Sequence, residues 1–475
     1  MYIDGQWTYS GRVGNFDVLN PATGEIIGSV PDGDGDDAAA AIDAAARAFP
    51  AWSGLTAYQR SEYLYRAYQI MMERKEDLAR TMTQEQGKPL RAARNEVQYG
   101  ADFLLWYAEE AKRVYGETIP APRGDQRFFV AHQPIGVVAA ITPWNYPVSM
   151  ITRKVAPALA AGCTIVLKPA EATPLCAVEV FKALADAEIP AGVANLVTAM
   201  DPRPIGAEFI VNQAVQKITF TGSTEVGKAL ARGAADQMKC ISLELGGHAP
   251  FIVYDDANAE HAAKGASLVK FLNTGQACIS PNRMFVHRSI AEPFVETLVA
   301  RVTRMRGGNG MDEGVSIGPL VNEAAVHKVE EQVADALDKG AKLGCGGHRL
   351  IEDGLEKGHF YAPTVLLDVT PEMTIYREET FGPVAPVIAF DDEDEVLEMA
   401  NDTHYGLAAY VYTRDISRAY RSFEKLRFGI IGINDINPTA AAAPFGGMKE
   451  SGMGREGGRE GLGEYLETKL GGFSI

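Results

Sequence analysis

Runs of consecutive apolar residues, many of them β-branched, alternate with helical patterns over most of this chain. In the first half we expect strands at 136–141, 164–167, 194–197, 217–220 and 241–243, with helices such as 174–187 and 224–235 between several of them. A second alternation follows, with strands expected near 251–254, 284–287, 384–389, 409–412 and 429–433. Continuous apolar strands alternating with helices are typical of a parallel sheet covered on both faces. The pattern therefore predicts an α/β fold with two such domains.

The segments outside this alternation show other patterns. Two helical patterns open the chain, an alanine-rich one at 36–49 and a longer one from about 56 to 113. Residues 117–133 contain Pro120, Pro122 and Gly124 and then an apolar stretch at 128–131. Because Pro and Gly interrupt regular elements, we expect this segment to leave the core and to end in a strand. The chain closes with a tail rich in Gly and Glu.

Composition narrows the class of protein. The 475 residues are 46% apolar and 23% charged, an ordinary balance for a globular chain of two or three domains. The net charge of −17 argues against a nonspecific binder of nucleic acid, because that role requires a basic face. The five cysteines are odd in number, scattered and without a CxxC pair, so we expect neither a metal site nor a disulfide framework.

The same features indicate where the protein works. Free thiols in a chain of this size are typical of a reducing compartment. The N-terminal residues lack the basic and apolar regions of a signal peptide. The most apolar stretch, 155–167, is broken by Pro157 and Gly162 and is too short to span a bilayer. We therefore expect a soluble cytoplasmic protein that contacts neither membranes nor nucleic acid.

Polar residues and glycines follow the ends of the predicted strands in the first half. Ligands of open α/β sheets bind beyond the carboxyl ends of the strands, so these residues are candidates for a nucleotide site. The segments in question are Thr142-Pro143-Trp144-Asn145-Tyr146-Pro147, Lys168-Pro169-Ala170-Glu171, Gly222-Ser223-Thr224-Glu225-Val226-Gly227 and Glu244-Leu245-Gly246-Gly247. Their convergence on one edge predicts a nucleotide cleft.

The loop at 222–229 also suggests a rival function. It nearly matches the phosphate-binding pattern GxxxxGK[ST], which would make the chain a P-loop nucleotide hydrolase. That loop needs a hydroxyl group after the lysine to hold Mg²⁺, and Ala229 has none. We therefore favour a helix N-terminus whose backbone amides face a pyrophosphate.

Cys278 is the best candidate for a reactive residue. It lies in the segment Asn273-Thr274-Gly275-Gln276-Ala277-Cys278-Ile279-Ser280, where Gly275 and the polar neighbours end a helical pattern and permit a tight backbone. Cys163, Cys176, Cys240 and Cys345 stand in apolar or ordinary settings, and we interpret them as structural.

Several motifs together resemble the aldehyde dehydrogenase superfamily. They are Phe220-Thr221-Gly222-Ser223-Thr224-Glu225, Leu243-Glu244-Leu245-Gly246-Gly247, Gly275-Gln276-Ala277-Cys278, Glu378-Glu379-Thr380-Phe381-Gly382-Pro383 and Pro444-Phe445-Gly446-Gly447-Met448-Lys449. They occur in the family's order and spacing, and the resemblance runs from about residue 20 to 468. Within the superfamily the chain is most similar to the succinate-semialdehyde dehydrogenase branch, through Ile151-Thr152-Arg153-Lys154 and 251–257.

The resemblance implies NAD(P)-dependent oxidation of an aldehyde to a carboxylic acid through a thioester. Cys278 matches the nucleophile, Asn145 the side-chain donor to the oxyanion, and Glu244 the base that activates the hydrolytic water. A thiolate suits this role because it attacks well and later leaves well. Lys154 matches a lysine that could relay protons, although pairing with a carboxylate is an equally good interpretation. All three central groups are present, which argues against a non-catalytic member of the family.

The resemblance also implies a set of cofactor-binding residues. Lys168 and Glu171 match positions that hold the adenosine ribose, and a carboxylate there repels a 2′-phosphate, so NAD is favoured over NADP, which stays possible. The residues expected to bind the cofactor are Thr142, Pro143, Trp144, Lys168, Glu171, Gly222, Ser223, Leu245, Gly246, Glu379 and Phe381.

The substrate site departs from the branch. There we expect two arginines and a serine around a substrate carboxylate; Arg153 matches the first arginine, Leu272 replaces the second, and Thr439 replaces the serine. The substrate is therefore a semialdehyde such as succinate semialdehyde or, alternatively, a more apolar aliphatic or aromatic aldehyde. Arg283 could compensate, although a structural arginine is the simpler interpretation. The mouth is expected to comprise Tyr146, Met150, Leu272 and Phe445.

The implied fold has two doubly wound α/β domains, a Rossmann-like cofactor domain and a catalytic domain, plus a small β oligomerisation arm. We expect the NAD-binding domain at 1–115 and 135–246, the catalytic domain at 247–447, and the arm at 116–134 and 455–475. The arm implies a homodimer or homotetramer, near whose interface Arg455 and Glu467 are hypothesised to form an ion pair. The branch's second cysteine is Ser280 here, so we expect no disulfide at Cys278.

Overall fold

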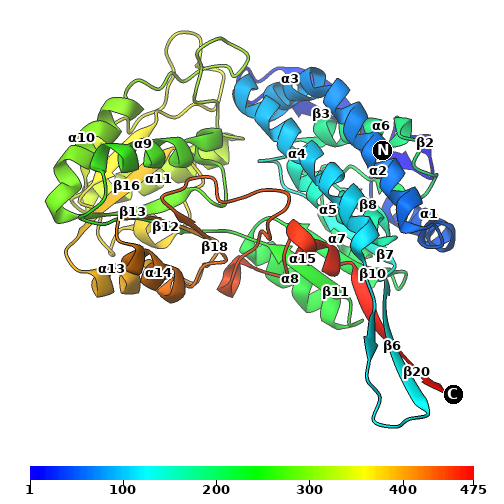
Figure 1. Cartoon of the computed structure of the whole chain (residues 1–475). Coiled ribbons are helices and arrows are strands. Elements are labelled where there is room, and N and C mark those ends of the chain that lie inside the picture. Colours follow the sequence, from blue (N-terminus) through cyan, green and yellow to red (C-terminus); the bar gives the residue numbers. More distant parts are fainter.

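The first of two large sheets has eight strands in the order β19-β11-β10-β7-β8-β9-β1-β2, in a computed structural model that describes all 475 residues (Figure 1). Its five central strands are parallel. Strand β7 lies between β8 and β10, so the strand order reverses there, as at the ligand-binding switch point of doubly wound sheets. The strands are β1 (Tyr2–Ile3), β2 (Gln6–Trp7), β7 (Val137–Ile141), β8 (Thr164–Lys168), β9 (Ala194–Leu196), β10 (Val215–Thr221), β11 (Cys240–Glu244) and β19 (Gly452–Met453).

Helices cover both faces of this sheet. Successive residues of β7 point to opposite faces and therefore pack against different helices. Val138 and Ala140 pack with the helices α2 to α6, whereas Val137 and Ala139 pack with α1 and α7. The helices are α1 (Gly35–Ser53), α2 (Ala57–Glu73), α3 (Lys75–Gln86), α4 (Leu90–Glu110), α5 (Ser149–Ala161), α6 (Pro174–Asp186), α7 (Arg203–Val211) and α8 (Thr224–Ala235). A separate hairpin joins β3 (Gly14–Leu19) to β4 (Ile26–Asp32).

The single helical pattern predicted over 56–113 is wrong, because the segment forms three helices and a final 3-10 turn, Ala111–Arg113. The first break falls at Arg74, whose backbone leaves the helical region. The second falls at Gly87, which ends α3 with a positive φ of 91°, and Pro89 follows at the start of α4. Gly and Pro make this sharp corner possible because glycine tolerates positive φ and proline favours the first turn of a helix.

The second sheet has seven strands in the order β14-β15-β16-β13-β12-β17-β18, all parallel except β14. Apolar cores fill both of its faces. Its strands are β12 (Ala249–Val253), β13 (Pro281–His287), β14 (Lys342–Cys345), β15 (Thr364–Leu367), β16 (Val384–Phe390), β17 (Ala408–Tyr412) and β18 (Ile430–Ile433). Its helices are α9 (Ala259–Lys270), α10 (Ala291–Val302), α11 (Glu323–Asp338), α12 (Thr374–Arg377), α13 (Glu393–Asn401) and α14 (Ile416–Lys425). The two doubly wound α/β domains are therefore present.

A three-stranded sheet projects from the body of the molecule (Figure 1). It consists of β5 (Glu117–Ile119), β6 (Gln126–Pro134) and β20 (Leu466–Ser474), all antiparallel. The part of the predicted arm before Leu466 lies elsewhere, because α15 (Gly458–Gly463) packs against α4 and α5. The exact domain limits given above stay a proposal.

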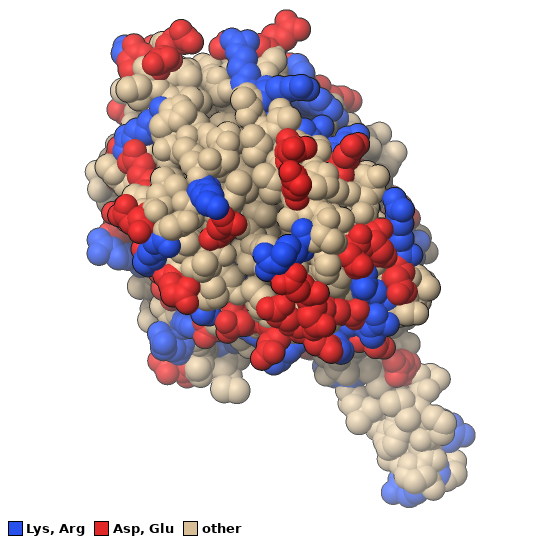
Figure 2. All heavy atoms as spheres, turned by 90° about the vertical axis from the view of Figure 1, so that its left-hand side faces the viewer, with Lys and Arg blue, Asp and Glu red and all other residues tan.

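Charged side chains are interspersed on the face of the molecule that the catalytic domain presents. Figure 2 shows Lys and Arg scattered among Asp and Glu there, without a continuous basic surface on that face. None of the helices combines the length and the apolar character needed to cross a membrane.

Candidate active site

The carboxyl ends of four neighbouring strands in the first sheet, β11, β10, β7 and β8, bring the predicted cofactor residues to one edge. Strand β7 leads into Thr142-Pro143-Trp144-Asn145, β8 ends at Lys168 near Glu171, β10 leads into Gly222-Ser223, and β11 ends at Glu244 before Leu245-Gly246. The clustering of these segments follows from the parallel register, because adjacent parallel strands end at the same edge.

The second sheet meets this edge with the amino ends of its strands. Gly246 and Gly247 run directly into β12, Cys278 precedes β13, and the segment with Glu379 and Phe381 precedes β16. The Gly247 amide donates to the Glu379 carboxylate at 3.0 Å. The active site is therefore a boundary between two sheets.

One contact across this boundary joins the two predicted halves of the cofactor site. Trp144, which follows β7, and Phe381, which precedes β16, pack edge to face with ring centroids 5.6 Å apart. Each aromatic ring follows or precedes a strand of a different sheet, so this pair is a direct contact between the two halves of the predicted cofactor site.

The loop before Cys278 has an unusual backbone. Asn273, Thr274 and Gly275 all have positive φ, at 50°, 61° and 76°. Such a conformation is strained for a β-branched residue, and the Thr274 hydroxyl stabilises it by accepting from the Gly318 amide at 3.0 Å. Gly275 is required here, since a Cβ at this position would lie 2.1 Å from the Gly382 carbonyl oxygen. The loop is a tight left-handed turn that presents Cys278 at its end.

Cys278 is partly exposed, and its thiol resists ionisation in the resting structure. Burial, and then the negative charge of Glu244, raise the pKa of Cys278 to about 12, whereas the charge of Arg153 opposes the shift. A base or a bound substrate must therefore assist formation of the thiolate.

Asn145 lies buried beside residues 273–278, which we call the nucleophile loop after the predicted role of Cys278. Its side-chain amide Nδ2 donates to the Gln276 carbonyl at 3.1 Å, and its Oδ1 accepts from the Tyr146 amide at 3.1 Å. Asn273 Nδ2 in turn donates to the Asn145 carbonyl at 2.9 Å. One hydrogen of the Asn145 amide remains free to bind an oxyanion next to Cys278, because an amide NH₂ group has two donors.

Glu244 stands at the end of β11 with its carboxylate buried against Gly446, where a Cβ would lie 2.9 Å from Oε1. Neither carboxylate oxygen has a hydrogen-bond partner in the chain. Burial, and then the charge of Glu456, raise the pKa of Glu244 well above its ordinary value. A buried carboxyl group with a raised pKa suits a general base near neutral pH.

Arg153 and Lys154 share one carboxylate that the sequence did not single out. Arg153 Nη2 lies 2.8 Å from Glu456 Oε2, and Lys154 Nζ binds Glu456 Oε1 and lies 3.2 Å from the Thr219 hydroxyl. Burial alone would raise the pKa of Glu456, but the two cations lower it. Lys154 is thus the partner of a carboxylate, which is one of its two predicted interpretations.

Among the predicted substrate residues, Phe445 packs directly on Arg153, with 4.0 Å between its ring centroid and the guanidinium Cζ. Met150 lies one turn earlier on α5 and is buried, and Tyr146 is half-buried against Lys88. Leu272 is 42% exposed at the outer end of the nucleophile loop. Tyr99 on α4 joins this group: burial raises its pKa, whereas Arg153 and a hydrogen bond with Thr439 oppose the shift. No sequence motif points to Tyr99, which lies within a predicted helix and far from every motif in the chain.

Three further expectations have clear outcomes. Arg283 is fully buried in β13 and donates to the carbonyls of Met399, His248 and Ala400, so it is a structural arginine. Arg455 and Glu467 do not pair within the chain, because Arg455 donates to the carbonyls of Gly447 and Gly454, whereas Glu467 lies on the arm. Lys228 of the P-loop-like segment pairs at the surface with Glu450 at 2.8 Å.

The residues at the first sheet edge fit a dinucleotide. The hydroxyls of Thr142 and Thr221 are buried without a hydrogen-bond partner in the chain. Ser223 caps the twelve-residue helix α8, whose free amides face the same edge. Lys168 Nζ lies 3.5 Å from Glu171 Oε2. Unpaired hydroxyls, amides and a lysine-carboxylate pair supply the donors and acceptors that phosphates and a ribose require.

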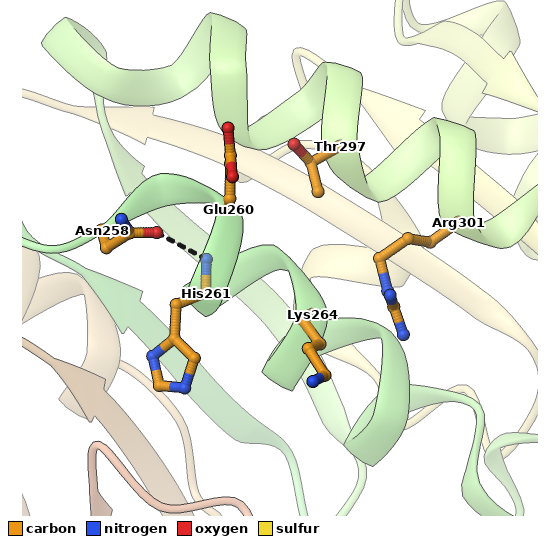
Figure 3. A pocket seen from close by; sticks show the side chains of 6 residues that line it. All are labelled: Asn258, Glu260, His261, Lys264, Thr297 and Arg301. Atoms are coloured by element: carbon orange, nitrogen blue, oxygen red, sulfur yellow. Dashed lines mark hydrogen bonds between the residues drawn. The ribbon is translucent and has the colours of Figure 1, made fainter.

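A second polar hollow lies outside this site. It is lined by Asn258, Glu260 and His261 of one turn and by Lys264, Thr297 and Arg301, on the outer side of α9 and α10 (Figure 3). Asn258 is occupied in capping α9 through the His261 amide. The hollow shares no residue with the strand edges and contains no apolar lining residue.

Comparison with known proteins agrees with this geometry. Residues 7–470 match the model of the Aldehyde dehydrogenase family. The chain is 51% identical over 467 residues to the NADP(+) succinate-semialdehyde dehydrogenase of Escherichia coli (98% of this chain, 96% of that protein). It is 50% identical over 468 residues to the glutarate-semialdehyde dehydrogenase of Pseudomonas putida (98% and 96%).

A solved structure extends the likeness to three dimensions. The crystal structure of succinate-semialdehyde dehydrogenase from Burkholderia pseudomallei superposes with a TM-score of 0.97 at 47% identity, covering 100% of this chain and 97% of that one. The match of sequence, fold and motif order over nearly the whole length shows that this chain belongs to the aldehyde dehydrogenase family.

Proposed function

We propose that this chain oxidises a short aldehyde with an anionic terminus to the corresponding acid, with NAD as the preferred acceptor. The observation that carries the proposal is the meeting of Cys278, Asn145 and Glu244 at the boundary of the two sheets, with Arg153 beside them. The relatives named above act on succinate and glutarate semialdehydes, both of which carry a terminal carboxylate. Semialdehydes are therefore the favoured substrates.

The chemistry follows from the three central residues. The Cys278 thiolate adds to the aldehyde carbon, and the Asn145 side chain and the Cys278 amide stabilise the resulting oxyanion. A nicotinamide cofactor held by the strand-edge residues would supply the hydride acceptor that turns the adduct into a thioester. Glu244 then takes a proton from water, the water oxygen attacks the thioester carbon, and the acid leaves as the thiolate is restored. A positioned base contributes about 10²–10⁴-fold to such a step.

Replacement of Glu244 by Gln should separate the two half-reactions. We expect the variant to form about one NADH per active site in a rapid burst and then to turn over at least about 10²-fold more slowly, because thioester hydrolysis loses its base.

In the wild type, kcat should rise with pH. The pKa values of Glu244 and Cys278 are raised, so the deprotonated, active fraction of each group increases as pH increases.

Stopped-flow NADH absorbance from pH 6 to 9 tests both statements. Glu296→Gln, on the exposed surface of α10 and outside every segment of the site, is the matched control and should behave as the wild type. Loss of the burst in Glu244→Gln would place Glu244 at or before thioester formation and contradict its role as the hydrolytic base.

Glu171 is proposed to set the preference for NAD. Its carboxylate is exposed at the end of β8 beside Lys168, where it can accept from both ribose hydroxyls and repel a 2′-phosphate. Glu171→Ser should raise kcat/KM for NADP by about tenfold or more, equivalent to about 1.4 kcal/mol, and lower it for NAD. Glu179→Ser, on the surface of α6, is the control. Equal use of both cofactors by the wild type would overturn the preference.

The substrate tail is proposed to lie between Arg153 and Leu272. Adding the missing cation through Leu272→Arg should raise kcat/KM for succinate semialdehyde by about tenfold or more, because charge-assisted hydrogen bonds to a carboxylate are strong, and should leave hexanal within about twofold. Leu268→Arg adds the same charge on exposed α9 and serves as the control.

A steady-state screen of wild type and variants covers succinate semialdehyde, glutarate semialdehyde, hexanal and benzaldehyde. A wild-type preference of about a hundredfold for an apolar aldehyde would instead assign the chain to the alternative substrate class. In that case Leu272 has remade the pocket.

We also propose that the arm pairs subunits into a homodimer or homotetramer. Its sheet exposes Phe129, Leu470 and Phe473, at 47%, 62% and 55%. Leu470→Asp with Phe473→Asp should yield monomers of unchanged secondary structure in light scattering coupled to size exclusion. Lys469→Glu alters charge on the same strand without removing apolar area, and it should keep the wild-type mass. A monomeric wild type would refute the proposal.

A further inference from the structure

The corner between α3 and α4 carries a buried cation that no step of the chemistry uses. The Lys88 side chain is 1% exposed, and its ammonium has three neighbours: the Glu96 carboxylate, the Asn145 carbonyl oxygen at 2.7 Å, and the Tyr146 ring, 4.1 Å from its centroid. Two of these three neighbours belong to the segment that presents the oxyanion donor. An ammonium so enclosed is costly unless each of its partners is in place.

Glu96, the partner of Lys88, holds the other end of the same segment. Its Oε1 accepts from the backbone amides of Val148 and Ser149 at 3.0 and 3.3 Å. These amides lie at the start of α5, whose N-cap residue, Val148, makes no side-chain cap hydrogen bond. The Glu96 carboxylate thus supplies the missing cap and favours the positive end of the helix. Together the pair binds residues 145 to 149 at both ends.

The same corner touches the catalytic domain on its other side. The Leu90 amide donates to the Gly310 carbonyl at 2.9 Å. Gly318 packs so closely on the corner that a Cβ there would lie 2.2 Å from the Gly87 carbonyl oxygen, and a Cβ at Gly87 would lie 2.5 Å from Pro319. Figure 1 shows α3 and α4 on the side of their domain that faces the catalytic domain.

Residues 318–321, which pack on this corner, also hydrogen-bond to the nucleophile loop. Gly318 exchanges hydrogen bonds with the Thr274 hydroxyl, and Gln276 donates from Nε2 to the Pro319 carbonyl at 3.3 Å and accepts from the Val321 amide at 2.9 Å. Contacts to the same corner therefore hold both Asn145 and the loop of Cys278 in place. Their relative position depends on it even though they belong to different sheets.

We propose that Lys88 and Glu96 are a positioning pair that fixes the Asn145 peptide, and thereby its side-chain amide, at the distance from Cys278 that the oxyanion requires. Neither residue touches substrate or cofactor. The pair acts because the Asn145 carbonyl is anchored by the Lys88 ammonium from behind while Asn273 anchors it from the nucleophile loop. This inference rests on the proposed role of Asn145 and not on the choice of aldehyde.

The test is a double-mutant cycle with propanal and NAD as an uncharged probe pair. Lys88→Met should lower kcat/KM by about a hundredfold, the cost expected of a misplaced catalytic group. In an Asn145→Ala background the same change should cost less than about threefold, since nothing is left to position. Glu96→Gln keeps its volume and an acceptor and should show the same non-additivity at about tenfold, which covers the case that Lys88→Met does not fold.

A matched control separates positioning from stability. Lys217→Met breaks another buried ion pair, Lys217–Glu464 at 3.3 Å, and should lower Tm while leaving kcat/KM within about twofold in both backgrounds. Equal losses for Lys88→Met in both backgrounds would show a general structural effect and overturn the inference. An undiminished kcat/KM in Lys88→Met would overturn it as well. If Asn145→Ala alone leaves kcat/KM unchanged, the proposed oxyanion role of Asn145 is wrong. That single-variant result is distinct from the non-additivity that the double-mutant cycle measures.

Discussion

The close approach of Gly247 to the nucleophile is the constraint on which the rest of the site depends. A Cβ on Gly247 would lie 2.2 Å from the Cys278 carbonyl oxygen, so only glycine lets the chain pass from β11 to β12 in contact with the nucleophile loop. That passage places the carboxyl edge of one sheet against the amino edge of the other. Glu244 precedes it by three residues and is thereby held at the boundary, while Glu379 fastens the Gly247 amide from β16's side. A side chain at Gly247 would therefore move Glu244 away from the loop that carries Cys278.

Two buried carboxylates at this boundary, Glu456 and Glu244, have pKa values shifted in opposite directions. Glu456 lies between Arg153 and Lys154, which lower its pKa, whereas Glu244 has no hydrogen-bond partner and its pKa is raised by burial and by Glu456. Pairs of like groups whose surroundings push their pKa values apart mark acid and base assignments. Glu456 thus favours the charged forms of both cations: the pKa of Arg153 is raised, whereas burial still lowers the pKa of Lys154. Glu244 has no hydrogen-bonded cation, which fits its proposed role as the general base.

The sequence predicted what is local and missed what is assembled. Strand periodicity located the sheets and the residues that follow each strand, and Gly275 with its polar neighbours singled out Cys278 as the candidate nucleophile. The hydrophobic pattern continues across the corner at Gly87 and so predicts one helix there, although Gly87 and Pro89 are residues that break helices. Lys88, Glu96 and Tyr99 carry no motif: each gains its meaning only when α4 packs against the segment after β7. Its position in the chain places Glu456 in the predicted arm. Only the folded structure brings it into contact with Arg153.

The electrostatics of Arg153 bear on the substrate. A free arginine in a buried pocket would attract any anion, but here the guanidinium is already neutralised on one side by Glu456 and covered by Phe445 on another. An incoming carboxylate must compete with or share that environment, and Leu272 offers no second cation. Loss of one arginine from a carboxylate site costs on the order of 2–5 kcal/mol. In the proposed substrate site, an anionic tail would therefore meet a single cation that is already paired with Glu456 and stacked under Phe445.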